Sequence, residues 1–131
     1  MAVIITAFLY FAAVFAVAFA MGVARVLVVA PRVGPTIAVL VEVPFILAVS
    51  WIVARRLLRG RPFGDPQRAM IGGIAFALLM ASEAALAGLI RDQSISQWAM
   101  ALATPLGLVG MAGQLGFAAI PFIAGHTQKL N

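Results

Sequence analysis

The sequence has no cysteine, a single histidine and few charged residues. Of its 131 residues, 10% are charged and 64% are hydrophobic. Without cysteine, disulfides, thiolate metal sites and thiol catalysis are excluded, and His126 lies too near the C-terminus to ligate haem deep inside a bundle. We therefore expect no cofactor and no metal. Soluble chains carry about 25% charged residues, so the shortage of charge predicts that lipid surrounds most of this chain.

Four apolar segments account for most of the sequence. They cover residues 2–24, 35–54, 69–90 and 98–124, and each reaches the ~20 residues that a helix needs to cross a bilayer. No Lys or Arg precedes the first segment, which is longer than the apolar core of a signal peptide, so we expect a retained spanning helix. Pro44, Pro105 and Pro121 are expected to bend their helices. The sequence predicts an all-α fold: one transmembrane domain over residues 1–131, a polytopic four-helix bundle.

The basic residues are unevenly distributed between the two ends of these segments. The link 55–68 contains Arg55, Arg56, Arg59, Arg61 and Arg68, and Lys129 falls on the same side, whereas the other side has Arg25, Arg32 and Arg91. Short cytoplasmic loops are enriched in Lys and Arg, which predicts that both termini are cytoplasmic (N-in/C-in). The net charge of +5 is thus a topology pattern, and we expect no nucleic-acid partner. The five link arginines are candidates for contact with lipid head groups.

Small residues recur at helical spacing in three of the segments, of which the first contains Ala12, Ala16, Ala20 and Ala24. Gly73, Ala77, Ala81 and Ala85 are spaced by four, and Gly107, Gly110, Gly113 and Gly116 by three. Such stripes let transmembrane helices approach closely. They are compatible with packing inside one bundle and with self-association.

Two carboxylates lie inside the apolar segments, where an unpaired charge is costly. Glu42 is seven residues from the start of its segment and Glu83 is seven from the end of its own, which places both ~10 Å below the same, outer surface. We predict a polar cluster centred on these two acids. The candidate counter-charges are Arg25, Arg32 and Arg91, and Thr104 is a further hydrogen-bonding candidate. Gln114, midway along the last segment, is expected to donate between helices.

Three interpretations of this cluster remain open. It is a structural ion pair or hydrogen bond that sets helix register, a site for a proton, cation or cationic solute on a transport path, or a site that recognises a lipid, a quinone or a partner subunit. The first favours a non-enzymatic accessory or assembly subunit, or a homo-oligomer, and this is the function we expect. The alternative is a small transporter or channel subunit that uses Glu42 and Glu83, and an enzyme acting on a lipid ranks third. The expected partners are the bilayer, other membrane subunits or a second copy.

One resemblance bears on location. Arg25-Val26-Leu27, Pro31-Arg32-Val33-Gly34 and Glu42-Val43-Pro44 resemble a pattern in small four-helix bacterial inner-membrane proteins, which also have a second acidic residue where Glu83 lies here. The resemblance implies a multi-pass protein of the bacterial inner membrane and assigns no activity.

Overall fold

In the computed structural model, four long helices form a bundle. The structure describes the backbone of residues 1–130 and the side chains of residues 1–127. Its elements are α1 (Ala2–Ala24), a π-helical turn η1 (Arg25–Val29), α2 (Ala30–Val33), α3 (Pro35–Leu58), α4 (Asp65–Arg91), α5 (Ile95–Leu102) and α6 (Pro105–Leu130). Helices spanning 2–33, 35–58, 65–91 and 105–127 are long and apolar enough to cross a membrane. The prediction of an all-helical fold with four helices long and apolar enough to cross a membrane is confirmed.

The first helical segment is longer than predicted, because the expected link 25–34 is helical up to Val33. A π-helical turn precedes Pro31, whose ring would clash with the carbonyl of Leu27 in a regular α-helix. Gly34 then ends the helix with a φ of 88°, a backbone conformation that glycine adopts without penalty. Pro35 begins α3 directly afterwards. The long helix 2–33 and α3 are therefore joined by a single residue.

The fourth predicted segment is wrong at its start, because residues 98–124 are not one helix. The short helix α5 ends at Leu102, and α6 begins at Pro105. Pro105 was predicted to bend a helix, and this is wrong. Pro105 begins α6 instead, because proline has no N–H to donate and suits the first helical position. The Thr104 hydroxyl accepts the N–H of Gly107 at 3.0 Å and so caps α6. α3 extends four residues beyond the predicted end of the second segment, and α4 begins four residues before the predicted start of the third.

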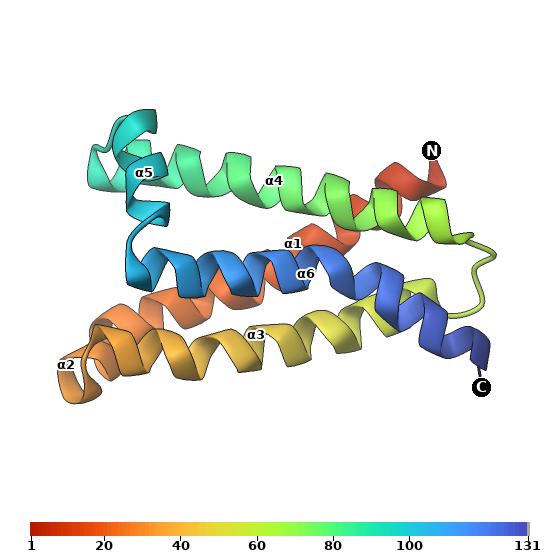
Figure 1. Ribbon diagram of the computed structural model, residues 1–131, viewed down its shortest axis with the longest axis horizontal. Helices are drawn as coiled ribbons and strands as arrows, with labels where there is room; N and C mark the ends of the chain where they lie inside the picture. Colours follow the sequence, from red (N-terminus) through yellow and green to blue (C-terminus); the bar gives the residue numbers. More distant parts are fainter. Residues whose placement is uncertain (131) are drawn as a thin grey trace.

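The four long helices pack in a ring. The backbone of α1 packs closely against α3 and α4, and that of α6 packs against the same two helices. Over the described residues, the backbones of α1 and α6, and those of α3 and α4, do not approach closely. In Figure 1, α4 and α3 accordingly lie on opposite sides, with α1 behind and α6 in front. Both termini and the loop 59–64 lie at one end, and α2 and α5 lie at the other. We call the half with the termini the closed half, and the half with α2 and α5 the open half.

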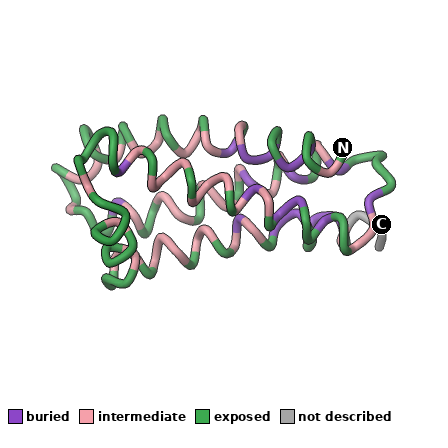
Figure 2. Tube along the Cα trace, turned by 90° about the horizontal axis from the view of Figure 1, so that it is seen from above, coloured by how far each residue is buried: buried purple, intermediate pink, exposed green. Residues whose placement is uncertain are grey.

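Most of the buried side chains belong to the closed half. One core cluster contains Tyr10, Phe11, Val14, Ala54, Ala75, Phe117, Ile120 and Ala124, and a second contains Ala7, Leu58, Phe63 and Ile71. Figure 2 shows buried residues gathered toward the end with the termini, and mainly intermediate and exposed residues elsewhere. The helices are thus tightly joined at one end of the bundle and separate toward the other.

Tyr10 supplies a hydrogen bond that Pro121 removes from the backbone of α6. Pro121 lies inside this helix and has no N–H, so the carbonyl of Phe117 loses its usual donor. The Tyr10 hydroxyl of α1 donates to that carbonyl at 2.6 Å, and the Tyr10 ring stacks on Phe117 with ring centres 4.5 Å apart. Because a buried, unpaired carbonyl is costly in lipid, this contact fixes α6 against α1, although the two backbones do not pack closely.

The small-residue patterns of α4 and α6 lie in different environments. A Cβ atom at Gly113 would lie 3.0 Å from the Val43 side chain, and one at Gly116 would lie 2.9 Å from Leu47, so these two glycines pack against α3 inside the bundle. The α4 stripe faces outward instead: Gly73, Ala77, Ala81 and Ala85 are all exposed. Packing within one bundle therefore explains Gly113 and Gly116 of α6 but not the stripe of α4.

Candidate functional site

The open half contains a partly open cavity of about 470 Å³. All four long helices contribute to its walls, and α5 contributes Trp98, Ala101 and Leu102. Because α5 runs across the end of the bundle between α4 and α6 (Figure 1), it closes part of this end. Most of the lining is aliphatic or aromatic, with Phe15 and Phe117 on facing helices. Among these apolar walls lie Arg25, Glu42, Glu83, Arg91 and Gln114.

Glu42 is neutralised by an arginine. Its Oε2 lies 2.5 Å from the Nε of Arg25, and both side chains are partly shielded, with 17% of Glu42 and 32% of Arg25 exposed. The geometry follows from the single-residue turn at Gly34, which brings the end of the first helical segment next to the start of α3. Arg25 precedes this turn and Glu42 follows it. The ion pair ties η1 to α3 at one wall of the cavity.

Glu83 has a different kind of partner. The Nε2 of Gln114, on α6, lies 2.6 Å from both carboxylate oxygens of Glu83 and donates to them. Among the described residues, no basic side chain forms an ion pair with Glu83. Arg91 acts on it only through longer-range electrostatics, since it lies eight residues further along α4, ~12 Å along the helix axis. The negative charge of Glu83, when present, is therefore not neutralised by direct contact with a cation.

The same glutamine leaves one acceptor unused. The Oε1 of Gln114 is buried and has no hydrogen-bond partner among the described residues. A buried acceptor without a donor costs about 1–3 kcal/mol. The wall around Glu83 thus combines a carboxylate without a direct counter-charge and an amide oxygen without a donor.

The predicted site residues are mostly brought together. Arg25, Glu42, Glu83, Arg91 and Thr104 all line the cavity. The hydrogen bonds of the Thr104 hydroxyl are local, however, since it also donates to the carbonyl of Ala101. Arg32 lies exposed in α2 and is not part of the lining.

Two cavity residues gain their importance only from the fold. Gln114 was expected to donate between helices, but its partner could not be identified from the sequence. Trp98 lay at the start of a predicted span and lines the cavity because α5 turns across the bundle. A polar amide amid apolar residues was the one sequence feature that pointed to Gln114.

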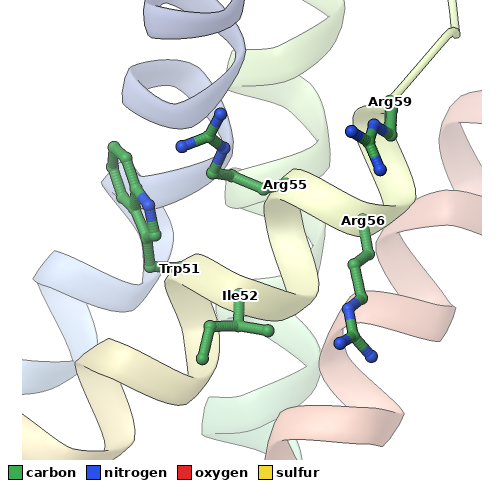
Figure 3. Close-up of a pocket in the computed structure, with 5 residues that line it drawn as sticks. All are labelled: Trp51, Ile52, Arg55, Arg56 and Arg59. Carbon is green, nitrogen blue, oxygen red and sulfur yellow. The ribbon is translucent and has the colours of Figure 1, made fainter.

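The five arginines proposed for lipid contact divide into two groups. Arg55, Arg56 and Arg59 line a shallow surface pocket of about 330 Å³ with Trp51 and Ile52 on α3 (Figure 3). The other two do not line this pocket. Arg61 donates to the Thr6 hydroxyl at 2.8 Å, and Arg68 is buried and forms an ion pair with Asp65 at 2.9 Å.

These features define a class of protein: a helical bundle with four candidate membrane spans and, between them, a mainly apolar cavity that contains a few charged and polar side chains. No protein-family model matches the chain, and no curated protein or solved structure is similar to it.

Proposed function

We propose that this chain is a small transporter or channel subunit of the bacterial inner membrane that moves a proton, a cation or a cationic solute by way of Glu42 and Glu83. The observation that carries the proposal is that both acids line one partly open cavity. A purely structural pair would be sealed between helices. Acidic residues at membrane depth that face a cavity are typical of ion and proton paths.

The proposed orientation is N-in/C-in, with the closed half on the cytoplasmic side and the cavity open toward the outer side. The charge distribution supports this, because the link 55–68 has five arginines, against Arg25, Arg32 and Arg91 on the other side, and short cytoplasmic loops are enriched in Lys and Arg. Lys129, which is expected on the same side as the link 55–68, lies outside the described side chains.

The two acids have different tasks in this proposal. Glu42, held by Arg25, keeps the wall of the cavity in place. Glu83 accepts hydrogen bonds from an uncharged amide, so its charge is available to a proton or a cation. Because an uncompensated carboxylate at this depth is unfavourable, occupancy by a cationic species stabilises the loaded state. Exchange between proton and solute at Glu83 is the step that couples them.

Replacement of Glu83 by glutamine tests this function. In liposomes with an imposed pH gradient, Glu83→Gln should lower protein-dependent proton flux, read with an entrapped pH-sensitive dye, by about tenfold or more. The variant should fold, because a glutamine amide still hydrogen-bonds to Gln114. Asp92→Asn is the matched control: Asp92 is an exposed acid outside the cavity, and asparagine suits its φ of 54°. Equal flux in wild type and Glu83→Gln would refute the proposal.

An accessory or assembly subunit is the second candidate function, and one observation favours it. The stripe Gly73, Ala77, Ala81 and Ala85 is exposed along α4. Such a smooth ridge is typical of helix–helix contacts in membranes, and no side chain among residues 1–127 covers it.

A bulky substitution in the stripe tests this second function. The pair Ala77→Leu and Ala81→Leu should dissociate any oligomer or complex seen by native mass measurement in mild detergent. The same pair of changes at Ala112 and Ala119, exposed alanines of α6, should leave it intact. A complex that survives the α4 pair, or is lost equally with the α6 pair, would contradict a role for the stripe.

A further inference from the structure

We propose that the occupant of the cavity is a protonated amine with an apolar body. This inference rests on the proposed function, because it names the solute class that Glu83 would accept. It is carried by three features of the cavity: its size and lining, the position of its uncompensated acid, and the unused acceptor of Gln114.

The size and lining of the cavity fit a small organic molecule. A volume of about 470 Å³ falls within the ~300–1,000 Å³ typical of small-molecule sites. Phe15 and Trp98 offer aromatic surface, and Val43 and Leu79 add aliphatic surface. Aromatic faces attract cations through the ring quadrupole, and they also bury an apolar body. The walls therefore suit a molecule that has both a charge and a hydrocarbon part.

The polar groups of the cavity fit an ammonium group that donates hydrogen bonds. Glu42 is already paired with Arg25, which leaves Glu83 as the acid available to a ligand. Beside it, the Gln114 Oε1 lacks a donor. An ammonium with two or more N–H groups would bond the carboxylate with one of them, and a small turn of the Gln114 amide would bring its buried oxygen within reach of a second. A quaternary ammonium has no N–H to donate. The pair of acceptors thus favours a primary or secondary amine.

A metal ion fits these groups less well. Among the described residues, no three His, Cys, Asp or Glu side chains are grouped to hold one. Hard cations such as Mg²⁺ and Ca²⁺ take six or more oxygen ligands, and the cavity offers mainly hydrocarbon. The same apolar walls that hinder a metal ion stabilise the body of an amine.

Trp98 provides a reporter for this ligand. The chain has two tryptophans, so Trp51→Phe leaves Trp98, at the cavity, as the only one. In nanodiscs of zwitterionic lipid, phenethylamine should change Trp98 fluorescence in a saturable way. Its neutral isostere 2-phenylethanol should bind about tenfold more weakly. Trimethyl(phenethyl)ammonium should bind more weakly by at least about threefold, because it lacks N–H donors.

Two variants locate the binding. Glu83→Gln should weaken phenethylamine binding by about tenfold or more. Gly110→Leu should do the same by filling space, since Gly110 lines the cavity and a Cβ there would meet nothing within 4 Å. Gly22→Leu is the control, because Gly22 also has open space around it but does not line the cavity.

The outcomes separate this inference from the function on which it rests. Equal affinity for the amine and the alcohol, no saturable amine binding, or amine binding unchanged by Glu83→Gln and by Gly110→Leu would overturn the amine assignment. Glu83-dependent proton flux in liposomes would then still support the proposed function. Loss of that flux dependence together with intact, Glu83-dependent amine binding would instead refute the transport role and keep the site.

Discussion

Gly72→Ala is expected to destabilise the bundle by about 1–3 kcal/mol, because the added methyl group has no room. A Cβ at Gly72 would overlap the backbone carbonyl of Ala118 on α6. A backbone atom cannot move aside as the tip of a flexible side chain can, so α4 and α6 would have to separate. Unfolding in mixed detergent micelles, followed by circular dichroism, measures the effect.

The adjacent residue is the control for this prediction. Gly73 is exposed and a Cβ there would meet nothing within 4 Å. Gly73→Ala should therefore be neutral or should stabilise α4 by about 0.5–1 kcal/mol through helix propensity. Similar stabilities for the two variants would show that the close approach of α4 to α6 at Gly72 is not what holds these helices together.

Tyr10→Phe is expected to lower stability by about 1–2 kcal/mol, although the ring and its stacking on Phe117 are kept. This exceeds the ~0.6 kcal/mol average for interhelical hydrogen bonds in a membrane protein. The Tyr10 hydroxyl donates to the Phe117 carbonyl at 2.6 Å. This carbonyl has no alternative donor in its own helix, because residue 121 is proline.

A double-mutant cycle with Pro121→Ala tests that reason. Alanine at position 121 supplies the N–H that the Phe117 carbonyl lacks, so Tyr10→Phe should cost about 1 kcal/mol less in this background. The readout is again the free energy of unfolding of the four proteins. If the tyrosine hydroxyl contributes equally with and without the proline, the repair of the α6 backbone is not its role.

The candidate site was partly predictable from the sequence. Two acids at equal depth indicated a polar cluster, and the cavity does contain Glu42, Glu83 and Arg25. Which acid would take the arginine was not predictable. Arg25 pairs with Glu42 because a one-residue turn at Gly34 places them side by side, and Glu83 meets Gln114 because α6, rather than α3, packs on α4.

The helix ends were less predictable than the helices. Apolar length located the four spans, since hydropathy sums over many residues. It did not reveal that Pro105 begins a helix or that the π-helical turn η1 carries the first helical segment to Val33. These boundaries depend on single capping and backbone contacts, such as the Thr104 hydroxyl on the N–H of Gly107, which a hydropathy pattern does not contain.

By itself, the sequence determined that the chain forms long apolar helices and that two of them contain an acid, Glu42 and Glu83, inside an apolar segment. These features follow from the hydropathy and charge of single residues and from the lengths of the apolar segments. Only the tertiary structure decided that α4 packs diagonally from α3, that its small-residue stripe faces outward and that Glu83 borders an open cavity. These outcomes depend on how each helix is rotated about its axis, and that rotation is set by contacts between distant residues, such as Gly72 with Ala118 and Tyr10 with Phe117.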